Sequence, residues 1–535
     1  MRKLIFLFLI FFSVNCYAED QLLKVRIDDF SGGQNSFDLS DVISPNQGTS
    51  FINIILNKKG VLSKRMGQTL FANDISDTAF TGLGTFYPSA TVSYILAASG
   101  PSIIRSDTVG ANWTTINGSN PLSSGKDTEF VQANNLLFIL NGSNQTPLYD
   151  GTTWTVSGGT TASPPTATTG AWIRNYFFCA GNPAHPDWLY FSNNLSPAVF
   201  TPTDIIPVNT GDGQKIINIE TFKLNELIVY KERSIFNLDL TGSTPLTDWT
   251  LQNVSSTIGC IAPRSVVNVG NDHIFLSSDP IAVRTLVRTS YDKITIDRLS
   301  TPIQDIFDGT GDTAINKTYI SKACAVLFDD KYILAIPTGS STLNNLVCVY
   351  DFVTKSWYLI NGWYPAEWVV FNNNLYCINA QDGMIQQCFT GTTGDVTPGP
   401  TVITNAASSA TVGISYTYTS KNIDFDNPEN FKQLDALDME FGTSGNYNAT
   451  VYIELDDGGF QDIGSINLAG NAPVLPINLP FNLGAGGVAR KTFQLQQYGE
   501  FKKIKIKIVQ SGLSQECYLH SFTLFATLKK WRREN

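Results

Sequence analysis

The sequence predicts an all-β protein, with a β-propeller-like array of six or seven blades followed by a C-terminal β-sandwich-like domain. Three observations support this fold class. Strand-forming residues dominate, and only 15% of residues are charged, against roughly 25% in typical soluble domains. A unit of short apolar strands recurs along the middle of the chain. Alternating strand patterns then return after a segment rich in Thr, Gly, Pro and Ala.

The first eighteen residues have the layout of a secretory signal peptide. Arg2 and Lys3 precede the apolar run Leu4 to Val14, and small residues occupy positions −3 and −1 of a cut after Ala18. The run is too short to span a bilayer, which takes about 20 residues. We expect residues 1–18 to form a separate signal-peptide-like segment. The alternatives are a mis-set start and an apolar arm that remains in an assembly.

Residues 19–80 predict an N-terminal β arm, and residues 81–392 predict the propeller-like repeats. Seven segments combine a turn, an apolar strand, a second turn and a further strand. Their spacings are 42, 40, 50, 47, 58 and 43 residues when one phase marker is taken in each: Ser93, Asn135, Asn175, Asn225, Asp272, Asp330 and Asn373. A period in the forties with several strands per unit is typical of a propeller blade, because radial stacking buries faces that one blade cannot bury alone. A set of β-meanders is the alternative.

Residues 393–412 predict a linker and residues 413–535 a C-terminal β domain. Within that domain, the segment from Lys502 to Ile508 places Lys and Ile at alternating positions. We expect a strand whose lysine face is solvated or protects a sheet edge, and favour this over a nucleic-acid-binding stripe. The turn Asp456-Asp457-Gly458-Gly459 predicts a hairpin rather than a calcium loop, because no Glu follows at the required spacing.

Composition argues against several kinds of chemistry. The net charge of −10 disfavours a surface that grips nucleic-acid phosphates. The chain has only three histidines, in unrelated contexts, and His185 lies in a predicted surface turn. Eight cysteines occur without a C-x-x-C pair, most of them in apolar runs, and are expected to be free core thiols. We therefore predict no enzyme activity, no catalytic, cofactor-binding or metal-binding residues, and no cofactor.

A series of glycine and polar positions lies near the predicted mature N-terminus. Phe30-Ser31-Gly32-Gly33-Gln34-Asn35 is followed by Pro45, then Asn53, then the segment from Gly60 to Gly67 that contains Arg65. This series resembles a pattern, F-x-G-G-x-N followed by G-x-L-x-x-R-x-G, of podovirus tail tubular (nozzle) and tail hub proteins of tailed bacteriophages. The matching positions are Gly32, Gly33, Asn35, Pro45, Asn53, Gly60, Arg65 and Gly67.

Gln34 departs from the pattern, which commonly has Leu there, and two later segments also resemble the family. One runs from Trp357 to Gly383; the other runs from Thr419 to Phe425 and continues with Asn430-Phe431-Lys432. The signal-like N-terminus is a second departure, because tail proteins assembled in the cytoplasm need no leader.

The resemblance implies a non-enzymatic structural protein of the virion tail, a nozzle or hub ring below the portal and adaptor. It implies a homo-oligomer, a hexamer, with the portal, the adaptor and other tail proteins as partners. DNA would pass through the lumen of this ejection channel without sequence-specific contact, and an acidic protein suits a conduit that repels DNA.

Two alternatives remain open. A secreted or periplasmic β-propeller binding protein would account for the signal-like N-terminus. A propeller glycosidase would need sialidase-type Asp-boxes, and the nearest match, Ser106 to Trp113, is a single degenerate copy.

Overall fold

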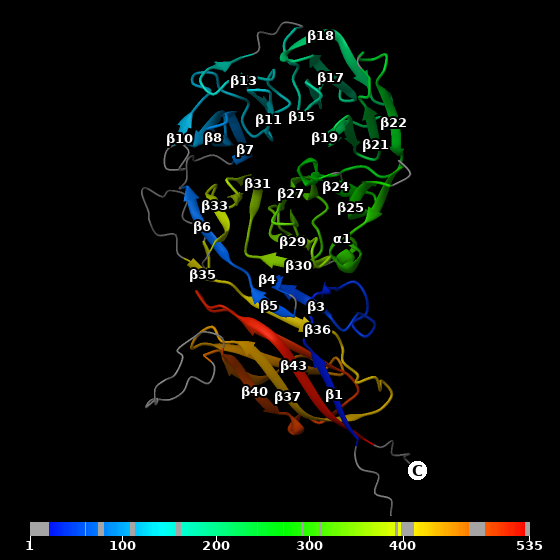
Figure 1. Ribbon diagram of the computed structural model, residues 1–535, viewed down its shortest axis with the longest axis vertical. Coiled ribbons are helices and arrows are strands. Elements are labelled where there is room, and N and C mark those ends of the chain that lie inside the picture. Colours follow the sequence, from blue (N-terminus) through cyan, green and yellow to red (C-terminus); the bar gives the residue numbers. More distant parts are fainter. Residues whose placement is uncertain are drawn as a thin grey trace, which may run out of the picture.

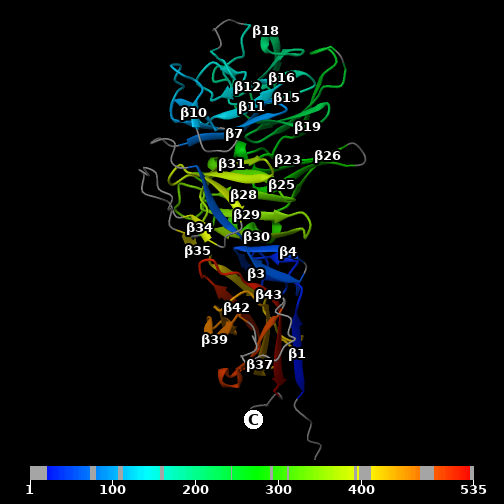
Figure 2. The same ribbon diagram turned by 60° about the vertical axis from the view of Figure 1, so that its left-hand side comes forward.

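The computed structural model describes residues 21–58, 60–72, 80–106, 113–156, 162–242, 244–270, 272–289, 293–309, 313–390, 394–396, 411–469 and 487–529. The protein is all-β, with 57% strand and 4% helix. A β-propeller occupies one end of an elongated molecule and a two-sheet sandwich the other (Figure 1, Figure 2). The predicted signal-like segment 1–18 lies outside the described residues.

The propeller has seven four-stranded antiparallel units, six of which are separate sheets. The first three blades are β7 (Phe80–Ser89), β8 (Val92–Ser99), β9 (Ser102–Ser106) and β10 (Trp113–Thr115); β11 (Glu129–Ala133), β12 (Leu136–Leu140), β13 (Leu148–Tyr149) and β14 (Trp154–Thr155); β15 (Thr169–Ile173), β16 (Tyr176–Ala180), β17 (Trp188–Asn193) and β18 (Ser196–Pro207). The next two blades are β19 (Ile216–Lys223), β20 (Glu226–Lys231), β21 (Ile235–Asp239) and β22 (Thr250–Ser255); β23 (Val267–Val269), β24 (Asp272–Ser278), β25 (Ile281–Arg288) and β26 (Ile294–Arg298).

The sixth and seventh blades connect the propeller to the rest of the chain. They are β27 (Cys324–Phe328), β28 (Lys331–Ile336), β29 (Leu346–Asp351) and β30 (Ser356–Asn361); β31 (Pro365–Phe371), β32 (Asn374–Asn379), β33 (Ile385–Thr390) and β6 (Gly67–Ala72). The sixth blade is part of a ten-stranded sheet that continues into the sandwich. The seventh takes its outermost strand, β6, from the N-terminal segment, with Ile385 opposite Ala72. The ring is therefore closed by strands from both ends of the repeat region.

The first strand of each blade faces the propeller axis. Strands β7, β11, β15, β19, β23, β27 and β31 pack in this order, and β31 packs against β7 to complete the ring. All seven phase markers predicted from the sequence lie at or beside the turn between the first and second strands. Asn and Asp tolerate the left-handed backbone of tight hairpins, and Asn134, Asn175, Asp330 and Asn373 have φ of 58, 65, 53 and 59° at these turns. The repeat in the sequence is thus a repeat of hairpin turns.

The sandwich combines both ends of the chain in two sheets. One sheet contains β4 (Ile54–Lys58), β5 (Val61–Lys64), β43 (Tyr518–Leu528), β37 (Lys432–Gly442) and β40 (Val488–Gln494), with β1 (Leu22–Ile27) on β43 and β41 (Glu500–Phe501) on β37. The other contains β2 (Gly33–Gln34), β3 (Gln47–Ile52), β36 (Tyr416–Ser420), β42 (Ile504–Gln510), β38 (Asn448–Leu455) and β39 (Gln461–Asn467). The predicted arm 19–80 is therefore divided: β1 to β5 complete the sandwich, and β6 completes the propeller.

Two expectations about the C-terminal half need correction. Within the predicted linker 393–412, β34 (Gly394–Val396) pairs with β35 (Thr411–Gly413), while residues 397–410 lie outside the described part. The lysine-rich strand β42 alternates buried and half-buried residues as expected, but it lies between β36 and β38. It is not an edge strand, because hydrogen-bonded neighbours flank it on both sides.

Helices are few and short among the described residues. They are α1 (Gln304–Asp308) and the 3-10 turns η1 (Pro263–Ser265), η2 (Thr301–Ile303), η3 (Ile320–Lys322) and η4 (Gln496–Tyr498). No helix in the described part of the chain is long and apolar enough to cross a membrane. One hydrophobic core extends from the sandwich into the sixth and seventh blades, so the two ends of the molecule share buried residues such as Tyr358, Trp363 and Trp368.

Candidate functional site

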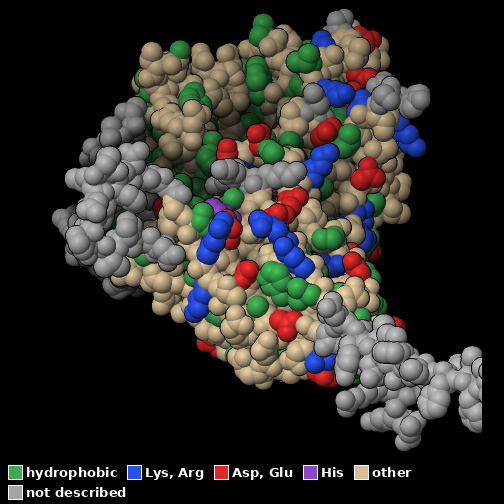
Figure 3. Space-filling model, turned by 60° about the horizontal axis from the view of Figure 1, so that its bottom comes forward, with side chains coloured by type: hydrophobic (Ala, Val, Ile, Leu, Met, Phe, Trp, Pro, Cys, Tyr) green, Lys and Arg blue, Asp and Glu red, His purple; other side chains and the backbone are tan. Residues whose placement is uncertain are grey.

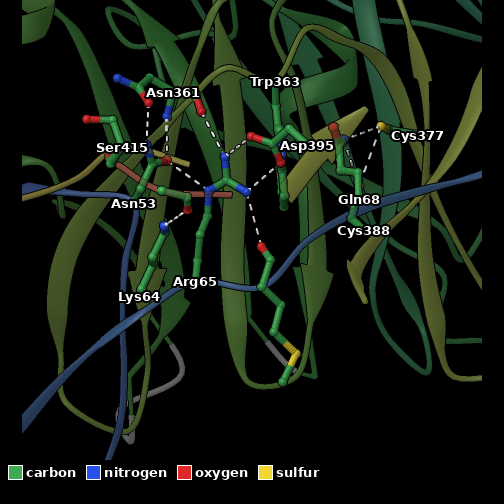
Figure 4. Close-up of polar contacts among 12 residues, drawn as sticks. Asn53, Lys64, Arg65, Gln68, Asn361, Trp363, Cys377, Cys388, Asp395 and Ser415 are labelled. Atoms are coloured by element: carbon green, nitrogen blue, oxygen red, sulfur yellow. Dashed lines mark hydrogen bonds and ion pairs between the residues drawn. The ribbon is translucent and has the colours of Figure 1, made fainter. Parts of the chain in front are cut away.

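Two places in the structure bury charged side chains, and we call them the junction and the channel cavity. The junction is the contact of Asn53, Arg65, Asn361, Trp363 and Asp395, where the N-terminal segment passes between the sandwich and the propeller (Figure 4). The channel cavity lies on the propeller axis. The motif found in the sequence includes Asn53 and Arg65 of the junction, whereas no residue of the channel cavity was predicted as a site.

Arg65 is fully buried at the centre of the junction. Its Nη1 donates to Asp395 Oδ1 at 2.8 Å, its Nε to Asn53 Oδ1 at 2.8 Å, and its Nη2 to the Asn361 carbonyl at 3.0 Å. The guanidinium also lies over the Trp363 ring, 4.6 Å from its centroid. Trp363 in turn donates from Nε1 to Asp395 Oδ1 at 2.8 Å. The buried charge therefore has a counter-charge and hydrogen-bond acceptors from both parts of the molecule.

Asn53 connects the segments that meet around Arg65. It follows β3 with φ of 58°, and its side chain donates to the Ser415 carbonyl at 2.8 Å and to Asn361 Oδ1. Its Oδ1 accepts from Arg65 and from the backbone N–H of Asn361. Next to Arg65, Lys64 donates to Gln510 Oε1 at 2.8 Å, and burial lowers the pKa of this lysine to about 8. An Asn is suited to this position because it tolerates left-handed backbone and carries both a donor and an acceptor.

Two motif glycines are required by close packing. A Cβ on Gly67 would lie 1.8 Å from the Gly394 carbonyl oxygen, at the contact of β6 with β34. Gly33 has φ of 63°, and a Cβ there would lie 2.6 Å from the Trp357 carbonyl oxygen. Both glycines hold the N-terminal segment against the propeller, and both exclude a side chain.

The other motif positions lie away from Arg65. Asn35 is buried and donates to Asp38 Oδ2 at 3.0 Å. Gly32 contacts Asn46 and Gln47, Pro45 is exposed, and Gly60 has φ of 76° in the turn between β4 and β5. The structure thus brings Asn53, Arg65 and Gly67 together and distributes the remaining five over the loops and strands that lead to them.

The channel cavity has a volume of about 1030 Å³. Its lining comes from the beginnings of the inner strands and from the loops after the second strands, so it occupies one end of the propeller axis. The half-buried lining residues include Glu129 on β11, Glu220 on β19, Glu367 on β31 and Arg264 on η1. Such a cavity, partly apolar and with a few convergent polar groups, has the size and character of a small-molecule site.

The carboxyl groups in the cavity differ in their partners. Glu367 accepts an ion pair from Arg264 Nε at 3.0 Å, whereas no ion pair within the described residues reaches Glu129 or Glu220. Glu129 receives only the Gly170 N–H at 3.2 Å and the Thr169 hydroxyl at 3.4 Å. Glu220 receives the N–H and hydroxyl of its neighbour Thr221.

Burial raises the pKa of all three carboxyl groups. The pKa of Glu129 rises to about 8, first through desolvation and further through the charges of Glu220 and Glu367. Desolvation raises the pKa of Glu220 to about 7, and that of Glu367 to about 7 against the opposing charge of Arg264. All three side chains line the same cavity, which is why the charges of Glu220 and Glu367 act on Glu129. Near neutral pH the cavity therefore holds carboxyl groups that can both donate and accept a proton.

The sequence contained an unused signal for this cavity. Glu129, Glu220 and Glu367 stand six, five and six residues before the phase markers Asn135, Asn225 and Asn373. Glu129 and Glu367 share one phase of the repeat, and all three acids lie on first strands, which every blade presents to the axis. Within any single repeat these acids form no recognisable motif, so the sequence did not single them out.

The remaining predicted features have separate places. As predicted, His185 is exposed in a turn, where it also stacks on Trp188. His273 is buried and contacts Tyr230. The seven cysteines of the described residues are all buried. The Asp456–Asp457 turn joins β38 to β39 as the expected hairpin. Most of the Asp-box-like segment, residues 107–112, lies outside the described residues. No group of three or more His, Cys, Asp or Glu in the described part of the chain is placed to hold a metal ion.

The fold defines the class of this protein as a seven-bladed β-propeller joined to a β-sandwich. No family model matches the chain, and no curated protein matches it. Three solved structures are similar to part of the chain. The computationally designed Ika8 protein has 11% identity over 61% of this chain and 100% of that chain, with a TM-score of 0.38. The extracellular domain of a hybrid two-component system from B. thetaiotaomicron has 11% identity over 62% of this chain and 41% of that chain, with a TM-score of 0.42, and the WD40 domain of Neurospora crassa Pan2 has 8% identity over 61% and 97%, with a TM-score of 0.37. At such identities the likeness concerns the fold alone.

Proposed function

We propose that the chain is a structural subunit of a bacteriophage tail, a nozzle or hub protein that forms a ring below the portal and adaptor. The observation that carries the proposal is the place of the motif residues. Asn53, Arg65 and Gly67 stand where the N-terminal segment leaves the sandwich and enters the seventh blade. A motif with this role preserves the relative position of two domains, which a ring-forming subunit requires.

The junction suits a protein that bears mechanical load. The propeller is held by β6, by the extension of the sixth blade into the sandwich sheet, and by the Arg65–Asp395 ion pair. Three connections at separate points resist bending better than a single linker. This arrangement supports a rigid tail component, in which the propeller projects from the sandwich.

Charge is consistent with a conduit for DNA. The net charge is −10, and on the face in Figure 3 acidic and basic side chains are interspersed, without a broad basic surface. Phosphate binding depends on clustered Lys and Arg, so a protein of this kind would let DNA pass with little retention. In the proposed ring, DNA makes no sequence-specific contact with the lumen.

The native mass of the purified full-length chain, measured by light scattering with N-terminal sequencing of the same sample, tests the proposal. We expect a ring of about six copies of the 58.6 kDa chain, visible by negative-stain microscopy. A monomer whose first residue is Glu19, recovered from the periplasm or medium, would contradict the tail role.

That contradicting outcome would favour the second candidate, a secreted or periplasmic propeller binding protein. The observation that favours it is the channel cavity, together with the signal-like N-terminus. A subunit whose role is purely structural has no need for three half-buried carboxyl groups facing one cavity.

A further inference from the structure

The channel cavity contains hydrogen-bond acceptors that the protein leaves without partners. Asn218 and Asn344 both line it, are 8% and 3% exposed, and have a buried Oδ1 with no hydrogen-bond partner. Their Nδ2 atoms are held by carbonyl oxygens, Asn218 by Pro263 at 2.9 Å and Asn344 by Pro365 at 2.8 Å. These bonds fix the amides so that the oxygens remain free. An unpaired buried acceptor costs about 1–3 kcal/mol, which a ligand donor can recover.

The unpaired carboxyl groups add to this excess of acceptors. Glu129 and Glu220 lie on different blades, and the charge of Glu220 raises the cost of ionising Glu129. No ion pair within the described residues links them to the positive charges nearby. Arg264 is engaged by Glu367 and Asp127, and the exposed lysines of the lining, Lys126, Lys215 and Lys322, extend into solvent.

The remainder of the lining is apolar enough to cover a hydrocarbon chain. Phe130, Ile217 and Val266 contribute to it between the polar groups. A ligand that satisfies this cavity therefore carries more than one cationic donor, with methylene groups between them. No group of three or more His, Cys, Asp or Glu in the described part of the chain is placed to hold a metal ion, so an organic cation suits these two carboxyl groups better.

We propose that the channel cavity binds a linear organic polyamine, a compound with two or more ammonium groups joined by methylene chains. Glu129 and Glu220 each pair with one ammonium group, and Asn218 and Asn344 accept further N–H donors. Because the two acidic residues, Glu129 and Glu220, stand on different blades, an extended dication fits better than a compact one. This inference does not depend on the tail role, because the same cavity is present in a ring subunit and in a secreted protein.

Titration calorimetry of the purified full-length protein at pH 8 and low salt tests it, with spermidine and 1,4-diaminobutane as ligands and 1,4-butanediol as the neutral control. We expect saturable binding of both amines, no binding of the diol, and at least about a tenfold weaker affinity in Glu129→Gln and Glu220→Gln, the value of one charged contact. Exposed Glu429→Gln is the matched control and should bind like the wild type.

Further measurements separate this site from general attraction to an acidic protein. Binding to the wild type should weaken between pH 8 and pH 5.5 and should release protons on binding, because the amine favours the ionised carboxylates. This readout remains available if a variant fails to fold. The proposal would be overturned if Glu129→Gln and Glu429→Gln reduced binding equally, or if binding were independent of pH. It would also be overturned if the diol bound as the amines do, or if no amine bound at all.

Discussion

At the junction the protein supplies a counter-charge for the ion it buries, whereas in the channel cavity it does not. Arg65 is fully enclosed and is met by Asp395, Asn53 and a backbone carbonyl. Glu129 and Glu220 are deep in the propeller, and only backbone and hydroxyl donors reach them. A buried charge with complete partners fixes one arrangement of the chain, whereas an uncompensated one raises the free energy of the folded state until something binds to it.

The junction should be the most sensitive point of the molecule. Replacing Arg65 with Met leaves Asp395 without its partner, and breaking a buried pair from one side costs about 3–5 kcal/mol. We expect Arg65→Met to lower the free energy of unfolding, measured by urea denaturation, by this amount. Arg490→Met, which removes the exposed partner of Glu440, is the control and should change stability by about 1 kcal/mol or less.

A variant that changes both partners sharpens this test. Arg65→Met combined with Asp395→Leu removes both charges, so it should recover part of the stability that Arg65→Met loses. If the double variant is no more stable than the single one, the ion pair is not what stabilises the junction.

Gly67→Ala should have the next largest effect, because it strains the same junction without changing a charge. The new Cβ would meet the Gly394 carbonyl at 1.8 Å, and backbone must move to admit it. We expect a loss of about 2 kcal/mol, within the range of overpacked sites. Gly487→Ala is the comparison: its neighbours are side-chain atoms of Thr443 at 3.1 Å, which can shift. Equal thermal midpoints for the two variants would contradict the steric argument.

The two regions also differ in how much the sequence could predict. Asn or Asp stands at the first hairpin turn of six of the seven blades, so the repeat was visible in the sequence. The sandwich was only half visible, because β1 to β5 come from residues that precede the propeller and pair with strands several hundred residues later. Local patterns carry no information about such distant pairing.

The same limit applied to the sites. Arg65 could be singled out by its motif, but its partner Asp395 lies in a segment whose composition predicted a linker. Glu129 and Glu220 line one cavity only because β11 and β19 both pack against β15. In each case the chemistry belongs to two residues that become neighbours through the topology, and neither has a distinctive sequence context alone.

The smallest predicted effect is a pH dependence that belongs to the cavity and not to the junction. The pKa of Glu129 is about 8 in the folded protein, against an ordinary value of 4.5. Between these values the folded state binds more protons than the unfolded chain, so the stability that Glu129 contributes falls as pH rises. The same holds for Glu220 up to a pKa of about 7. Arg264, Asp127, Glu367 and the exposed lysines face these groups in both wild type and variant.

A difference between variants isolates this contribution. His273, whose pKa burial lowers to about 4, acts in the opposite direction and loses stability as pH falls below 6.5, but it cancels in the comparison. In the absence of amines, the free energy of unfolding of Glu129→Gln relative to wild type should rise by about 1 kcal/mol from pH 5 to pH 8. One tenfold change in proton affinity is worth about 1.4 kcal/mol. Urea unfolding at four pH values measures it. Parallel curves for Glu129→Gln and wild type would mean that the carboxyl is already compensated, and the contrast between the cavity and the junction would then disappear.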